Sequence, residues 1–122
     1  MLENGTSTNL GFLTKYQSGL NDFRFLLDVG HINCKSNDLT FESFLDKLGS
    51  SIEHIHLHDN NGESGQHLPI GIGNIDMVNL IKILKKYNFD KTISIEFNSI
   101  NDIHFYEYSK NVLEKIWYKY YL

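Results

Sequence analysis

Three histidines at every second position, His54, His56 and His58, are the densest group of chemically active side chains in the sequence. Side chains two residues apart on a β-strand lie on the same face, so the three imidazoles are expected to point together. A fourth histidine, His67, follows after a polar loop that contains glycine. Imidazole binds metals and exchanges protons near neutral pH, so we predict a functional site where this strand meets its loop.

Carboxylates stand at three other places along the chain: Glu3 in the first residues, and Asp28 and Glu96 at the ends of apolar runs. With His56 they offer one ligand from each of four successive segments. Three carboxylates and a neutral imidazole suit a divalent cation such as manganese, cobalt, magnesium or zinc. No cysteine joins the set, which distinguishes it from structural zinc sites. We therefore predict a metal site from these four residues, without assigning the metal.

The elements that must position these residues alternate between strand and helix. Hydrophobic periodicity and cap residues predict strands at 23–29, 52–58 and 92–97 after a stub at 1–3, and helices at 10–17, 40–48, 76–87 and 103–118. Asp38 or Thr40 is expected to cap the second of these helices, and Asp76 the third. The order predicts an α/β fold of about four parallel β/α units. A complete eightfold TIM barrel needs about 200 residues or more, so we expect residues 1–122 to form one partial domain, half of such a barrel.

Composition narrows the class of protein. With 122 residues and 41% hydrophobic content, the chain can bury a core. A net charge of -4 gives no basic surface for nucleic acid, and no run of about 18 apolar residues is available to cross a membrane. The first residues lack the features of a signal peptide, and the single Cys34 cannot form an internal disulfide. We expect a cytoplasmic protein in which Cys34 is an ordinary free thiol.

Five runs, in this order, carry a resemblance to a known family: LEN at 2–4, LDVGH at 27–31, HIHLHDN at 54–60, HLPIGIGNID at 67–76 and ISIEF at 93–97. They resemble the C-terminal half of the xylose isomerase-like TIM-barrel superfamily. This group includes sugar phosphate isomerases and epimerases, inosose dehydratases and zinc-dependent apurinic-site endonucleases. The resemblance spans nearly the whole chain and implies the same half-barrel fold as the element order.

The resemblance also implies roles for individual residues. One metal is implied for Glu3, Asp28, His56 and Glu96. In the epimerases, the glutamates matching Glu3 and Glu96 are also catalytic, because they exchange a proton with the substrate from opposite sides. His31 and His67 match positions that contact substrate oxygens, or that hold an additional zinc in the endonucleases. The implied function is metal-dependent isomerisation or epimerisation of a sugar, polyol or related hydroxy-carbonyl compound.

Two alternatives stay beside this function. The first is metal-dependent phosphodiester hydrolysis like that of the apurinic-site endonucleases. Those enzymes hold their additional zinc with an aspartate two residues before the histidine matching His67, and Gly65 stands there in this chain, so this interpretation loses a ligand. Some ketose epimerases place an arginine on the substrate at positions matching 60–63. This chain has no arginine there, so the resemblance does not identify the substrate. The other alternative is a truncated, inactive half-barrel, or one that completes its site as a homo-oligomer or with a complementing half-barrel, because a four-stranded parallel sheet leaves two exposed edges.

For the other residues between 54 and 73, the sequence supports less specific predictions. His54 and His58 are expected to be structural, each bonded to a neighbour. Asp59 and Asn60 could orient the adjacent metal ligand or contact substrate. The glycines of 71–73 indicate a tight turn more than a phosphate cradle, since they lack a complete phosphate-binding motif.

Overall fold

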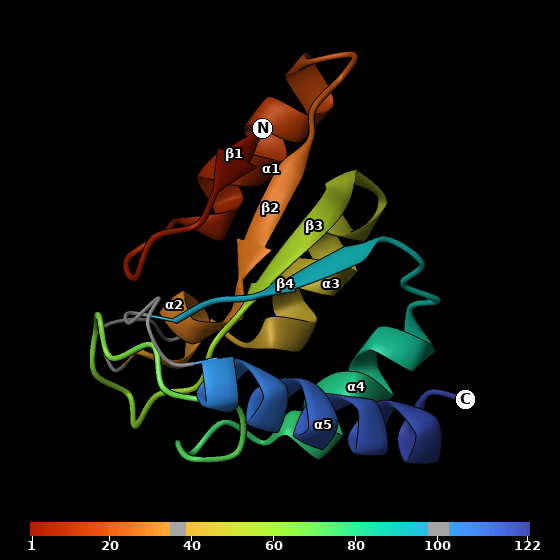
Figure 1. The fold of residues 1–122 in the computed structure, drawn as a ribbon. Helices are drawn as coiled ribbons and strands as arrows, with labels where there is room; N and C mark the ends of the chain where they lie inside the picture. Colours follow the sequence, from red (N-terminus) through yellow and green to blue (C-terminus); the bar gives the residue numbers. More distant parts are fainter. Residues whose placement is uncertain (35–38, 98–102) are drawn as a thin grey trace.

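The computed structural model describes residues 1–34, 39–97 and 103–122. Within them the chain forms one parallel four-stranded sheet, in the sequence order β1 (Leu2–Glu3), β2 (Phe25–Asp28), β3 (Ile52–Leu57) and β4 (Thr92–Ile95) (Figure 1). The helices are α1 (Leu10–Gly19), α2 (Val29–Asn33), α3 (Phe41–Leu48), α4 (Met77–Lys86) and α5 (Ile103–Tyr120), with a 3-10 turn at Gly49–Ser51. This order confirms the predicted α/β half-barrel.

One face of the sheet is packed against helices. The side chains of β2 and β3 that point toward the helices are completely buried: Phe25, Leu27, Ile55 and Leu57. Helices α1 and α3 lie behind the sheet in Figure 1, while α4 and α5 lie beside one another along its lower side. Each fully buried large apolar side chain contributes about 1.5–3 kcal/mol, so this face holds the fold together.

The opposite face of the sheet carries the polar side chains. The strand register places Leu26, His54 and Thr92 in one row, and the next row contains Asp28 and His56. Most of these side chains are half-buried or exposed, in contrast to the other face. In a complete barrel this face points toward the barrel axis, so the predicted site residues lie where the second half of a barrel would cover them.

The strands are shorter than the sequence pattern predicts. β2 begins at Phe25 rather than at residue 23, because its neighbours β1 and β3 pair with it only from Phe25 onward. β4 ends at Ile95, so Glu96 lies just beyond it, although the Glu96 N–H still donates to the Leu57 carbonyl at 3.0 Å. The residues after β2 form the short helix α2, which the sequence pattern did not predict.

Helix starts follow the predicted capping chemistry. The side chain of Thr40 accepts a hydrogen bond from Ser43 N–H at the start of α3, and that of Asp76 accepts one from Asn79 N–H at the start of α4. Asp38, the other predicted cap of α3, lies outside the described residues. Among the described helices, none combines the length and the apolar character that crossing a bilayer requires.

Candidate metal centre

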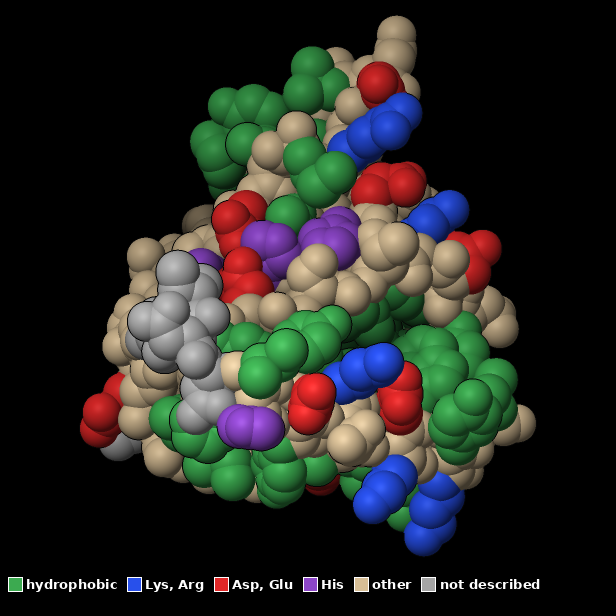
Figure 2. Space-filling model, in the orientation of Figure 1, with side chains coloured by type: hydrophobic (Ala, Val, Ile, Leu, Met, Phe, Trp, Pro, Cys, Tyr) green, Lys and Arg blue, Asp and Glu red, His purple; other side chains and the backbone are tan. Residues whose placement is uncertain are grey.

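The C-terminal ends of all four strands converge on a group of four side chains that we call the strand-end cluster: Glu3, Asp28, His56 and Glu96. His56 lies at its centre, with Nδ1 3.3 Å from Glu3 Oε1 and 3.0 Å from Glu96 Oε1. Ligand atoms of Glu3, Asp28 and His56 all lie within 4.8 Å of one another. Figure 2 shows acidic and histidine side chains gathered on this open face. The structure thus brings together the four residues predicted as metal ligands, and metal binding itself stays a prediction.

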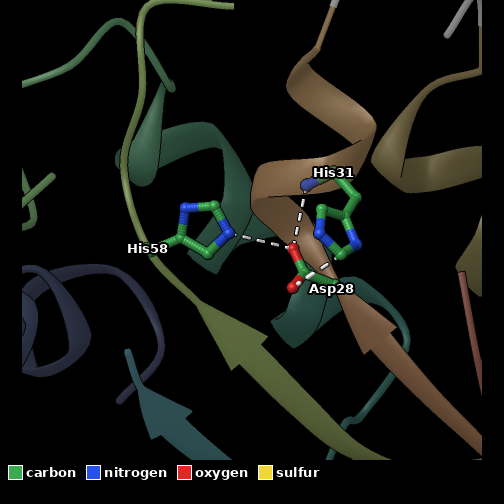
Figure 3. Close-up of side chains that lie close together, drawn as sticks. All are labelled: Asp28, His31 and His58. Carbon is green, nitrogen blue, oxygen red and sulfur yellow. Dashed lines mark hydrogen bonds and ion pairs between the residues drawn. The ribbon is translucent and has the colours of Figure 1, made fainter. Parts of the chain in front are cut away.

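Asp28 is the buried member of the strand-end cluster. Its carboxylate accepts a hydrogen bond from His31 N–H at 2.8 Å, which also caps α2, and faces His58 (Figure 3). Burial by itself raises the pKa of the Asp28 carboxyl, but His58 and the His31 N–H outweigh burial and hold the pKa below its usual range. Asp28 is therefore an anion at neutral pH, as a metal ligand must be.

Asn4 fixes the backbone of Asp28, a role that the sequence pattern did not reveal. Its buried side chain accepts from Asp28 N–H at 2.7 Å and donates to the Asp28 carbonyl at 2.9 Å. Its own carbonyl oxygen accepts from His31 Nδ1 at 2.7 Å. Asn4 thus extends the β1–β2 pairing through its amide and orients the imidazole of His31. In the sequence it stands in a turn-rich group, where asparagine is common for other reasons.

His58 is buried behind the strand-end cluster. It is 1% exposed, and its ring packs so closely on Gly30 that a Cβ there would come within 1.9 Å of the ring. The ring of His67 stacks on it at 3.9 Å between centroids. Burial alone lowers the pKa of His58, but the Asp28 carboxylate outweighs burial and the net pKa is raised. Glycine at position 30 is therefore required by the close approach of the ring.

His31 and His67 flank the strand-end cluster. His31 is partly exposed and its Nδ1 lies 3.5 Å from Asp28 Oδ2. His67 has a φ of 46°, in the left-handed region, and its Nδ1 lies 3.8 Å from Glu96 Oε2. Burial and the neighbouring His58 lower the pKa of His67, which favours its neutral form. Both rings thus lie beside carboxylates of the strand-end cluster, and their contacts with substrate stay predictions.

His54 and Cys34 lie outside this arrangement. His54 Nδ1 is hydrogen-bonded to the Thr92 hydroxyl, and burial together with the neighbouring His56 lowers its pKa. Cys34 is buried, and burial and the Asp28 charge raise the pKa of its thiol. A raised pKa leaves little reactive thiolate at neutral pH.

Asp59 organises the loop that carries His67. Its buried carboxylate accepts backbone N–H groups of three residues, Asn60, Gly71 and Ile75, at 2.9, 2.9 and 3.1 Å. Its backbone forms an antiparallel bridge with Leu68. A Cβ at Gly73 would lie 2.3 Å from the Asp59 carboxylate, so this glycine permits close packing. These contacts give Asp59 a structural role in the loop, and the two roles expected from the sequence, orienting His56 or contacting substrate, stay predictions.

Four parallel β/α units with their strand ends at one rim define half of a TIM barrel, the class of fold in which functional residues commonly lie at the C-terminal rim. The chain belongs to the xylose isomerase-like TIM barrel family, whose model matches residues 14–116. This confirms the superfamily resemblance inferred from the sequence motifs.

Two curated relatives come from Methanocaldococcus jannaschii. Uncharacterized protein MJ1614 is 44% identical over 84 residues, which are 69% of this chain and 32% of that protein. Uncharacterized protein MJ1311 is 43% identical over 75 residues, which are 62% of this chain and 26% of that protein. The chain therefore spans about a third or less of these relatives.

Solved structures with the same fold include several sugar epimerases. A D-tagatose 3-epimerase-like protein has a TM-score of 0.72 and 31% identity, with 96% of this chain and 46% of that chain covered. 3-Keto-D-glucoside 4-epimerase from E. coli has a TM-score of 0.67 and 17% identity, with 88% and 40% covered. An L-ribulose 3-epimerase has a TM-score of 0.64 and 17% identity, with 95% and 44% covered. The chain matches less than half of each protein.

Proposed function

We propose that this chain is the metal-binding half of an isomerase or epimerase that acts on a sugar, polyol or related hydroxy-carbonyl compound. The observation that carries the proposal is the convergence of Glu3 and Glu96 on His56, at 3.3 and 3.0 Å, from the two edge strands of the sheet. Two carboxylates on opposite sides of one site can remove and return a proton. The likeness to the D-tagatose 3-epimerase-like protein, which is 31% identical, supports a carbohydrate substrate.

The strand-end cluster fits a divalent ion on the chemistry of its donors. It offers the carboxylates of Glu3, Asp28 and Glu96 and the imidazole of His56. Asp28 is held in its anionic form. Such an oxygen-rich set accepts manganese, cobalt, magnesium or zinc. When bound, the ion supplies positive charge beside the oxygens of a hydroxy-carbonyl compound.

The protein's own side chains have separate tasks in this proposal. Glu3 and Glu96 hold and move the proton on the carbon next to the carbonyl. His31 and His67 bind substrate oxygens from the α2 side and the loop side of the cluster. The bond from His31 Nδ1 to the Asn4 carbonyl, at 2.7 Å, fixes the ring for this contact.

A cytoplasmic location stays our prediction from the sequence.

Proton exchange with solvent tests the proposed chemistry. Protein loaded with Mn²⁺ is incubated in D₂O with a panel of ketopentoses and ketohexoses, and nuclear magnetic resonance follows deuterium at the carbon next to the carbonyl. We expect incorporation into at least one sugar, and a rate on the order of 10²–10⁴-fold lower for Glu96→Gln at saturating metal, because a positioned base contributes about that much. His54→Asn, outside the cluster, should keep the wild-type rate. Absence of exchange across the whole panel would contradict the proposal.

We also propose that a second copy of this chain supplies the half-barrel that would close the open face. Both sheet edges, β1 and β4, lack a strand partner within the described residues. Large apolar side chains are exposed on the first and last elements of the chain: Leu2 on β1, Phe12 on α1, and Ile103 and Phe105 on α5. A two-fold axis along the barrel would place β4 beside the β1 of the other copy twice, giving eight parallel strands and covering both apolar patches.

Light scattering on the purified chain tests this assembly. We expect a particle with twice the mass of one chain. Phe12→Lys should shift the equilibrium toward the monomer, because a charge would be buried in the seam beside β1. Tyr118→Lys, at a 70% exposed position of α5, is the matched control and should remain dimeric. A monomer at every concentration would rule out self-assembly.

A further inference from the structure

Two carboxylates of the strand-end cluster stand at the open edges of the sheet. Glu3 lies on β1 and Glu96 directly follows β4, and their side chains are 43% and 30% exposed. Within the described residues, neither of these edge strands has a partner on its outer side. Closure of the barrel by a second copy would therefore bring both carboxylates to the seams between the copies.

The strand register determines which residues would meet at a seam. It pairs Glu3 with Leu26, Leu26 with His54, and His54 with Thr92, so a line across the strands from Glu3 reaches Thr92. Around a complete eight-stranded barrel, such a line returns to its first strand displaced by about eight residues. A two-fold axis divides this displacement into two equal halves of about four residues, one for each copy.

This displacement places Glu96 opposite Glu3 of the other copy. The convergence of Glu3 and Glu96 on His56 shows that the rim moves toward the C-terminal end of β4, and Glu96 lies four residues beyond Thr92. The four residues that the two-fold axis requires are therefore already present within one copy. The step from β4 to the other β1 then adds no displacement, and the two glutamates become direct cross-strand neighbours.

Each seam would thus hold a pair of like charges. Neighbouring strands lie about 4.8 Å apart, and directly opposed like charges destabilise a sheet. The repulsion is stronger inside a closed barrel, where less water screens it, than on the open face. Asp28 is paired with His58 at 3.2 Å, whereas Glu3 and Glu96 share the one imidazole of His56. Closure of the metal-free chain is therefore opposed by its own rim.

We propose that a divalent cation at the strand-end cluster controls self-association: the metal-free chain favours the monomer, and the metal-loaded chain closes the barrel with a second copy. This rests on the proposed function, from which it takes the metal site and the partner. A bound cation is the largest local charge in such a site and offsets the carboxylates on both sides of a seam. The dimer expected above then belongs to the metal-loaded chain.

Sedimentation equilibrium on the chelator-stripped full chain tests the coupling. The dissociation constant of the dimer is measured with EDTA and with saturating Mn²⁺. We expect Mn²⁺ to lower it by roughly 5–150-fold, the range typical of coupling between two binding events. Coupling of this kind is reciprocal, so the apparent affinity for Mn²⁺ should rise with protein concentration.

Glu3→Gln separates charge repulsion from other effects of the metal. The change removes one of the two charges at each seam and keeps the size of the side chain. The metal-free variant should therefore dimerise more tightly than the metal-free wild type, although it has lost a metal ligand. Glu53→Gln is the matched control, because it makes the same charge change on the central strand β3, and it should respond to Mn²⁺ as the wild type does.

The possible failures are distinguishable. Equal dissociation constants with EDTA and with bound Mn²⁺ would overturn the coupling and leave the metal site and the dimer of the proposed function standing. A monomer under both conditions would refute the assembly and its control together, while calorimetry with Mn²⁺ would still decide the metal site. Absence of Mn²⁺ binding would refute the site and the coupling at once. A metal-free Glu3→Gln dimer no tighter than the wild type would show that the seam charges do not oppose association.

Discussion

Replacing Glu96 or His56 by alanine is expected to weaken Mn²⁺ binding at the strand-end cluster by more than about 100-fold, or about 2.7 kcal/mol. His56 Nδ1 lies within 3.3 Å of both Glu3 and Glu96, so His56→Ala removes the central ligand and Glu96→Ala removes a ligand in direct contact with it. Mn²⁺ is the probe because a set of three carboxylates and one imidazole suits it. Isothermal titration calorimetry on chelator-stripped protein measures the loss.

The control for this prediction is His54→Asn on the same strand. His54 shares the open face with His56 and its ring lies 5.3 Å from that of His56, but its Nδ1 is bonded to Thr92. We expect its Mn²⁺ affinity to match the wild type. Because Glu96 and His56 are partly exposed, neither alanine variant should lose the fold, and circular dichroism checks this. Unchanged affinity in Glu96→Ala would remove this residue from the metal site.

The fold was accessible from the sequence because its periodicities are local. Alternation in a strand and three-to-four spacing in a helix determine which side chains share a face, and parallel β/α units then bring strand ends to one rim. This reasoning placed Asp28, His56 and Glu96 together although they lie far apart in the chain. The short helix α2 was missed because its start depends on one side-chain contact, from Asp28 to the His31 N–H.

The contacts that surround each site residue could not be predicted from the sequence in the same way. His54 and His58 have the same spacing from His56, yet His54 bonds to Thr92 on β4, while His58 is buried on Gly30 and His67. These partners come from other segments of the chain, and sequence spacing carries no information about them. Asn4 is a similar case, because its contacts with Asp28 span 24 residues.

Asp59→Ala is expected to lower the free energy of unfolding by about 3 kcal/mol, which corresponds to a fall in Tm of about 10 °C for a chain of this size. The change removes one buried carboxylate that accepts three backbone N–H groups, and it leaves a cavity beside Gly73. Charge-assisted hydrogen bonds contribute about 1.5–3 kcal/mol each, and water can replace part of the two that are only partly buried. Thermal denaturation followed by circular dichroism measures the effect.

Asp76→Ala is the matched control, because Asp76 is also an aspartate that accepts a backbone N–H, at the start of α4. It makes a single exposed contact, so its loss should cost only about 1 kcal/mol. Asp59→Asn should fall between the two, since its amide oxygen can still accept from Asn60 and Ile75 while its NH₂ would face Gly71 N–H. Equal losses for Asp59→Ala and Asp76→Ala would show that the Asp59 contacts do not hold the loop that carries His67.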